Sequence, residues 1–157
     1  MIKFEKIERK SFLLDTRQYM NIPELEAKRI YDDLKMPFRE DDFSAGYDFY
    51  APFDIVLDGR QAATKRGQNR MDVLTGILCN FGEFGRKCHL EIYPDKTLAR
   101  LDGVVFAEGT VIYDAKMFLT GEQIILPLSI VSEGKTRIMA GTKIGTGVIV
   151  QHGYVMQ

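Results

Sequence analysis

The sequence has 157 residues, of which 45% are hydrophobic, so it is long enough for one domain with a sizeable core and short for two. The formal net charge is -1, which disfavours the large basic face that binding to bulk nucleic acid requires. No apolar run reaches the length of a membrane span, and the first ten residues alternate charged with apolar side chains, unlike a signal peptide. We therefore expect one soluble, cytoplasmic domain over residues 1–157.

The few cysteines and histidines do not suggest a metal site. Cys79 and Cys88 do not form a CxxC pair, and His89 and His152 add no spacing typical of zinc ligands. We expect both thiols to be reduced, buried and inert.

Taken in order, the chain begins with apolar positions within residues 1–14 that favour one or two short strands. The period then changes, and residues 22–36 carry apolar side chains at helical spacing, with Pro23 near the start and Pro37 just beyond the end. This pattern predicts a helix over residues 22–36. The helix either packs over a sheet edge or binds a protein partner.

The next part of the chain predicts two strands, at residues 53–57 and 73–79, separated by a polar stretch. This stretch, residues 58–70, is rich in arginine and lysine. It is either a solvated loop or a source of contacts to phosphate. Residues 81–87 form a glycine-containing turn that lacks the spacing of a phosphate-binding loop.

Residues 90–118 hold most of the chemistry. A strand should end at Pro94, which has no N–H to donate, and Asp95, Lys96 and Thr97 follow as a polar turn. Residues 104–106 and 110–113 then predict a hairpin with its turn at Glu108-Gly109. Asp114 comes at the end of the returning strand, either as a solvated turn carboxylate or as a side chain that faces a cleft.

The last third of the chain predicts further short strands. Residues 124–130 are apolar enough to be buried on both faces, although Pro127 within them argues for an edge position or a bulge. Residues 132–134 turn the chain, residues 136–139 pair back, and residues 148–150 form the last strand. Many short strands with turns at intervals of about ten residues indicate an all-β sandwich or jelly roll.

Three segments together resemble one known family. LEIYPDKTLARLDGVVFAEGTVIYDAK, residues 90–116, is similar to the second and third motifs of the trimeric dUTPases, approximately LEIYPRSSLA and GLVLANGVGVIDSDY, and aligns without a gap. SAGYDFYAP, residues 44–52, resembles the first motif, and IMAGTKIGTGVIV, residues 138–150, resembles the fourth, usually of the form IKAGDRIAQGVFV. The resemblance implies an all-β, dUTPase-like jelly roll or β-clip that assembles as a homotrimer with ligand clefts between subunits. The helix at 22–36 and the basic loop at 58–70 then look like insertions.

The resemblance also implies roles for individual residues. Asp48 matches the aspartate that helps to bind the magnesium ion of the nucleotide, and Asp114 matches the general base that orients the attacking water. Nucleotide and phosphate contacts fall on Lys96, Thr97, Gly109, Lys116, Met117, Lys143 and Thr146. We expect Mg²⁺ only together with a bound polyphosphate nucleotide.

Several positions depart from the family motifs. Where the family has Arg-Ser-Ser, this chain has Asp95, Lys96 and Thr97, and an aspartate there repels a polyphosphate. Lys116 and Met117 replace an aspartate and a tyrosine, and we expect Lys116 to pair with Asp114 and to weaken it as a base.

The fourth and fifth motifs depart as well. Lys143 and Thr146 stand where the fourth motif has arginine and glutamine, so one long hydrogen-bonding side chain is lost. The final residues, QHGYVMQ, do not resemble the glycine-rich arm that folds over the γ-phosphate in the family.

Three hypotheses follow. The protein binds or sequesters a nucleotide, or a signal derived from one, with little or no hydrolysis. Alternatively it is an active pyrophosphohydrolase acting on dUTP or a related triphosphate, or a trimeric interaction protein without a ligand. Deamination, as in the related dCTP deaminases, is not expected, because the segment IILPLS lacks their glutamate. Small chains of this family are common in viruses of bacteria, so a viral protein in the host cytoplasm also fits.

Overall fold

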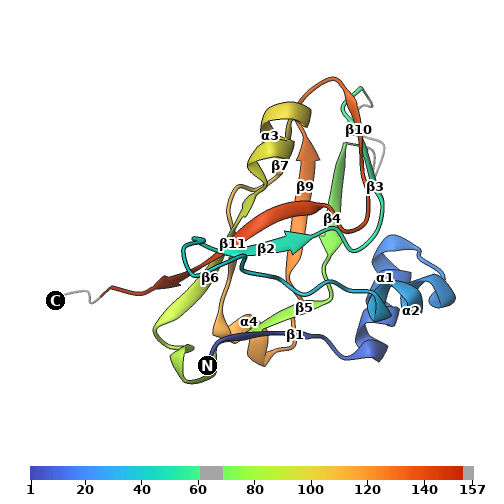
Figure 1. Ribbon diagram of the computed structural model, residues 1–157. Helices are drawn as coiled ribbons and strands as arrows, with labels where there is room; N and C mark the ends of the chain where they lie inside the picture. Colours follow the sequence, from blue (N-terminus) through green and yellow to red (C-terminus); the bar gives the residue numbers. More distant parts are fainter. Residues whose placement is uncertain (61–68, 154–157) are drawn as a thin grey trace.

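The computed structural model describes residues 1–60 and 69–153 (Figure 1). Its strands are β1 (Lys3–Lys6), β2 (Tyr47–Tyr50), β3 (Ile55–Asp58), β4 (Arg70–Leu74), β5 (Ile77–Asn80), β6 (Cys88–Pro94), β7 (Val104–Phe106), β8 (Val111–Tyr113), β9 (Ile125–Ile130), β10 (Lys135–Ile138) and β11 (Lys143–Gln151). Its helices are α1 (Arg9–Met20), α2 (Glu24–Asp32), α3 (Lys96–Asp102) and α4 (Ala115–Leu119), with a short 3-10 turn at Gly82–Phe84.

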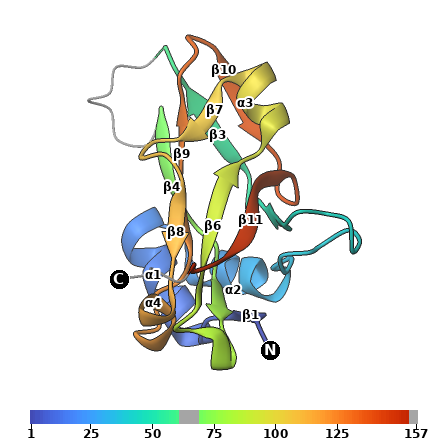
Figure 2. The same cartoon turned by 90° about the vertical axis from the view of Figure 1, so that its left-hand side faces the viewer.

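The strands pair antiparallel in four small sheets. The largest has the order β2-β11-β6-β8, a second has the order β4-β9-β7, and two pairs join β1 to β5 and β10 to β3. In both views, α3 lies at one end of the molecule and α1, α2 and α4 lie towards the other (Figures 1 and 2). The fold is therefore mostly β, as the sequence predicts, and the helices are minor additions.

The core lies between the sheets and follows the two-residue period of the strands. On β6, Leu90 and Ile92 are fully buried, while the intervening Glu91 faces outward. Leu126 and Leu128 of β9 are also fully buried and join the same hydrophobic cluster, but Pro127 between them is buried too, so β9 does not alternate. The outward face of β6 and its neighbours is thus left free to carry polar side chains.

The N-terminal segment differs from its prediction. Residues 9–14 form the first half of α1 instead of a second strand. Within α1, Phe12 and Thr16 are the buried residues, one turn apart, and Phe12 packs against Tyr31 of α2 with ring centroids 5.5 Å apart. The predicted helix at 22–36 is confirmed but shorter, since α2 spans Glu24–Asp32 with Pro23 as its N-cap. Only two positions of α1 are buried, and one of them is a threonine, so apolar residues do not recur along this segment with a clear helical period.

Two predictions for the central stretch are also wrong. The segments β7 and β8 do not form a hairpin: β7 pairs with β9 and β8 pairs with β6, so the two belong to different sheets. The residues after Pro94 are not a loose turn, because Asp95 caps α3 by accepting a hydrogen bond from the Leu98 N–H at 3.1 Å. Helix α3 therefore begins immediately after Asp95, at Lys96.

The last strands pair differently from the prediction. Strand β9 is the central strand of its sheet, not an edge. Pro127 is tolerated there because its missing N–H would point beyond the end of β7. The Pro127 carbonyl, on the same side, accepts the Ala107 N–H at 2.7 Å, just past the last paired residue of β7, so no ladder pair is interrupted. Strand β10 pairs with β3 rather than back on β9. The predicted strand at 73–79 is split at Gly76, whose φ is 70°, into β4 and β5 of different sheets.

Both cysteines are free and buried, as predicted. Burial raises the pKa of Cys79 to about 12, so this thiol stays protonated and unreactive. In the described part of the chain, no helix is long and apolar enough to cross a membrane.

Candidate functional site

Three strands of the largest sheet bring predicted site residues together on its outward face. Asp48 of β2 lies directly opposite Thr146 of β11, and Thr146 lies directly opposite Tyr93 of β6. Residues opposite each other in an antiparallel ladder point to the same face. The first and fourth sequence motifs therefore meet beside the strand that leads into the second.

A β-bulge adds Lys143 to this face. The pairing of β11 with β2 shifts between Lys143 and Gly145, so that one extra residue, Ile144, is inserted. Without it, Lys143 and Thr146 would point to opposite faces of the strand. With it, the Lys143 Nζ lies 3.0 Å from Asp48 Oδ1 and 3.9 Å from Asp95 Oδ1.

Asp95 connects this ion pair to α3. Its Oδ2 caps the helix, its Oδ1 faces Lys143, and its own N–H donates to the Ile144 carbonyl at 3.1 Å. Lys96 and Thr97 follow in the first turn of α3 and are exposed. We call Asp48, Asp95 and Lys143, with Lys96, Thr97 and Thr146 beside them, the Lys143 group.

Two further residues at this place were not predicted. Tyr50 lies opposite Lys143 in the ladder, and the Lys35 Nζ lies 3.7 Å from the centroid of its ring. Burial, with a smaller contribution from the Asp48 charge, raises the pKa of Tyr50, so its hydroxyl stays protonated at neutral pH. The alternation in SAGYDFYAP places Tyr50 on the same face as Asp48, but no signal in the sequence points to Lys35.

A second set of predicted residues lies elsewhere. Asp114 follows β8 and caps α4, its Oδ1 accepting the Met117 N–H at 2.9 Å. Asp114 and Lys116 are exposed and Met117 is half-buried. We call these three residues the Asp114 group. Gly109, with φ of 85°, lies in the turn before β8, at the opposite end of that strand from Asp114, and belongs to neither group.

The two groups lie at opposite edges of one sheet. Asp48 is on the edge strand β2 and Asp114 follows the edge strand β8, with β11 and β6 between them. Three strand spacings amount to about 14 Å, before any offset along the strands. Tyr93 is level with Asp48, whereas Leu90 is level with Tyr113, so the strands add a further offset. Within one chain, the carboxylates of Asp48 and Asp114 do not form one compact site.

The Asp114 group adjoins a groove that was not predicted. The groove has a volume of about 1500 Å³ and is lined by Met117 and Tyr113 together with residues of α1 and of β4, β7 and β9. At one side the buried Gln123 donates to Asp15 of α1 at 3.0 Å and accepts the Gly76 N–H at 2.8 Å. The sequence does not predict this groove because it does not predict α1, which forms one of its walls.

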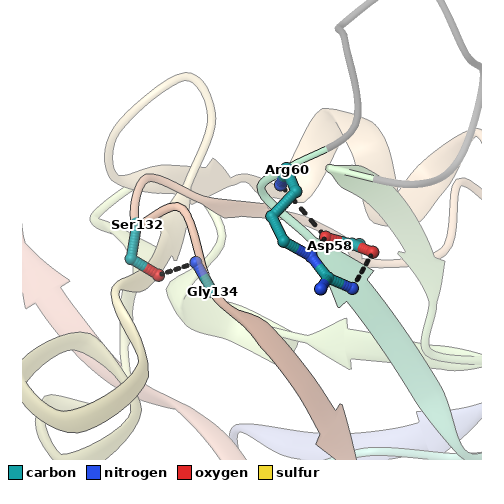
Figure 3. A network of polar contacts seen from close by, with 4 residues as sticks. All are labelled: Asp58, Arg60, Ser132 and Gly134. Atoms are coloured by element: carbon teal, nitrogen blue, oxygen red, sulfur yellow. Dashed lines mark hydrogen bonds and ion pairs between the residues drawn. The ribbon is translucent and has the colours of Figure 1, made fainter.

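The described arginines of the basic stretch, residues 58–70, are paired with carboxylates. Arg60 donates to both oxygens of Asp58. The turn that holds these two residues lies beside the Ser132–Gly134 turn (Figure 3). Arg70 pairs with Glu108 at 3.1 Å and Asp72 at 3.5 Å. Lys65 and Arg66 of the predicted basic loop lie outside the described residues. Both Arg60 and Arg70 therefore already have carboxylate partners in this structure.

The side chains present do not fit a magnesium ion held by the protein alone. In residues 1–60 and 69–153, no three His, Cys, Asp or Glu side chains are grouped so as to hold a metal ion. The Asp48 carboxylate, to which the motif resemblance assigns the magnesium, is instead paired with the Lys143 ammonium. A divalent cation would have to arrive with its own ligands.

The sequence matches no protein-family model and no curated protein. The structure, however, is similar to that of dUTPase from Streptococcus mutans, with a TM-score of 0.61 and 18% identity, covering 78% of this chain and 89% of that one. The chain has the dUTPase-like fold.

Two phage proteins share this dUTPase-like fold over the whole chain. A variant of the dUTPase from phage phi11 of S. aureus, described with a coordinated structural Mg(II) ion, has a TM-score of 0.65 and 14% identity over 100% of this chain and 94% of that one. A variant of the dUTPase from Staphylococcus bacteriophage 80alpha, with dUpNHpp, has a TM-score of 0.62 and 14% identity over 100% of this chain and 86% of that one. At sequence identities of 14–18%, the structural similarity shows a shared fold alone.

Proposed function

We propose that the protein binds a nucleotide, or a signal molecule derived from one, between two copies of its chain and hydrolyses it slowly or not at all. One observation carries the proposal. The Lys143 ammonium, the charge best placed to hold a phosphate, lies between the carboxylates of Asp48 and Asp95. Its charge is already balanced before any ligand arrives.

Binding between copies is supported by the position of the two groups. Asp48 and Asp114 lie at opposite edges of the same sheet, so a site that contains both groups would need the Asp114 group of a second copy. The motif resemblance implies clefts between subunits of a homotrimer, which supplies such an arrangement. The phage 80alpha dUTPase, which shares the fold, is described with the nucleotide analogue dUpNHpp.

Slow hydrolysis is supported by the pairing of Lys143 with carboxylates. Enzymes that cleave phosphoanhydrides rely on positioning and on charge stabilisation of the transition state. In this chain Lys143 is paired with Asp48, and Asp114 Oδ1 accepts a hydrogen bond at the N-cap of α4. Asp114 can still orient water with its other oxygen, but Lys143 would have to leave its carboxylate partners before it could stabilise the developing charge.

An active pyrophosphohydrolase is the second candidate, and one observation favours it. Asp114 and Lys96 are both exposed, so a bound triphosphate could reach a carboxylate base and an ammonium. In this case Asp114 acts as the base and Lys96 and Lys143 contact the phosphates.

The test is to incubate the protein and MgCl₂ with a nucleotide mixture that includes dUTP, and to analyse the free and the heat-released fractions by mass spectrometry. We expect an intact nucleotide or nucleoside in the heat-released fraction and no monophosphate in the free fraction. Lys143→Ala should weaken that retention. Monophosphate production that Asp114→Asn abolishes would establish the hydrolase instead, and the absence of both signals would favour an interaction protein.

A further inference from the structure

We infer that the Lys143 group selects a nucleoside, or a nucleotide whose phosphate is a diester, over a nucleoside triphosphate. This inference rests on the proposed function and concerns the same site. It follows from the charges and the hydrogen-bonding groups that the fold places around Lys143.

The contacting side chains of this group have a net negative charge. Asp48 and Asp95 contribute two negative charges and Lys143 one positive charge, which gives a sum of -1. The Asp48 and Asp95 side chains are only 24% and 13% exposed, so water screens them incompletely. A triphosphate, with a charge of about -4 at neutral pH, would meet two poorly screened carboxylates.

The nearest other cations do not reverse this balance. Lys35 lies over the Tyr50 ring, and its charge is offset by the Glu40 carboxylate, which also acts on Tyr50. Lys96 is exposed at the first turn of α3, where solvent screens its charge. The Asp114 group of a second copy would add one carboxylate and one ammonium, Asp114 and Lys116, and leave the sum unchanged.

The neutral groups at the same place suit a nucleoside. Thr146 lies in the ladder between Asp48 and Tyr93, and Tyr50, opposite Lys143, adds a second neutral hydroxyl group. Hydroxyl groups and carboxylates together can accept from and donate to sugar hydroxyls and base edges. A nucleoside therefore finds partners here without needing a net positive charge.

A singly charged diester is also accommodated. Lys143 makes one short contact, 3.0 Å to Asp48, and one long contact, 3.9 Å to Asp95. Turning away from Asp95 costs only the weaker of the two and frees the ammonium for one negative oxygen. Asp95 retains its hydrogen bond to the Leu98 N–H when this happens.

The experiment compares the affinities of the purified chain for uridine, thymidine, a 3′,5′-cyclic uridine monophosphate and dUTP by calorimetry, with EDTA present so that dUTP stays intact. We expect a nucleoside or the cyclic diester to bind at least about tenfold more tightly than dUTP. Asp95→Asn, which keeps an N-cap residue of similar quality, should raise the affinity for dUTP by at least about threefold and so narrow the preference for the nucleoside or the cyclic diester.

Asp102→Asn is the matched control, because it removes the same charge from the opposite end of α3. It should not change the preference. If dUTP binds as tightly as the nucleosides, or if Asp95→Asn leaves its affinity unchanged, the inference is overturned while the proposed function stands. If none of the four compounds binds, the proposed function itself fails and the inference fails with it.

Discussion

The Lys143 group and the Asp114 group use the same kinds of side chain in different ways. In the first, side chains from β2, β11 and the start of α3 contact one another, and two carboxylates share one ammonium. In the second, the side chain of Asp114 caps its own helix, α4, by accepting the Met117 N–H. The first is a cross-strand network in which the ammonium of Lys143 is already paired, whereas the second is a local cap that leaves Lys116 at the surface. A ligand therefore has to displace an existing ion pair in the Lys143 group, whereas it can reach the exposed Asp114 group directly.

Substitution of Gly147 by alanine should have the largest effect, because it disturbs the strand on which the Lys143 group is built. A Cβ at this position would lie 2.7 Å from Phe49 Cε2 and 3.0 Å from Leu90 Cδ1 in the core. We expect a loss of about 1–3 kcal/mol in the free energy of unfolding, measured by urea denaturation. Val150→Thr, on the outward face of the same strand, should change it by less than about 0.5 kcal/mol. Equal effects would contradict the packing described for β11.

Lys143→Met should have the next largest effect, since it leaves the Asp48 and Asp95 carboxylates together without a cation. We expect a loss of about 1–2 kcal/mol at pH 7, and partial recovery in the double variant Lys143→Met/Asp48→Asn. The matched substitution in the other group, Lys116→Met, should change stability by less than about 0.5 kcal/mol. Thermal or chemical unfolding of the four proteins tests this contrast, and an equal cost at Lys116 would remove it.

The helix caps provide a smaller and sharper comparison. Asp95→Ala and Asp114→Ala should each cost about 1 kcal/mol through loss of the N-cap. Asparagine keeps the cap, so Asp114→Asn should be close to neutral. Asp95→Asn also loses the ion pair with Lys143, so it should cost roughly a few tenths of a kcal/mol more than Asp114→Asn. Denaturation curves of the four variants measure these differences. A costly Asp114→Asn would mean that this carboxylate has a partner beyond α4.

Asp58 offers a reference carboxylate outside both groups. Its hydrogen bonds to Arg60 lower its pKa from 3.8 to about 2. Because the pKa is lower in the folded state, the stabilisation is complete above about pH 4 and is lost as the pH falls towards 2. Asp58→Asn should therefore flatten the decline of stability between these pH values without changing its shape near pH 7. An unchanged acid limb in the variant would show that the pair with Arg60 does not form in solution.

The sequence predicts much of the fold because its motifs come in order along several β-strands. It misses α1, where Phe12 is a buried helical residue with few periodic partners, and it joins β7 to β8, although each pairs with a different neighbour. Chain proximity favours a hairpin there, and only the tertiary pairing overrides it.

The candidate site is predicted less completely. Asp48 and Lys143 were both named, yet their contact depends on the bulge at Ile144, which spacing alone does not reveal. Asp95 carried a readable signal, since aspartate before a helical run is a common N-cap, but its second role beside Lys143 needs the folded chain. Lys35 and the groove beside α1 depend on segments far away in the sequence.

The most direct test asks whether one ligand site needs the Lys143 group of one copy and the Asp114 group of another. Two variants, Lys143→Ala and Asp114→Ala, are each assayed for nucleoside and nucleotide binding, alone and after being unfolded and refolded together. We predict that each variant alone binds weakly and that the mixture recovers part of the capacity, because mixed assemblies contain sites with both intact groups. A mixture that binds no better than the separate variants would contradict a site shared between copies.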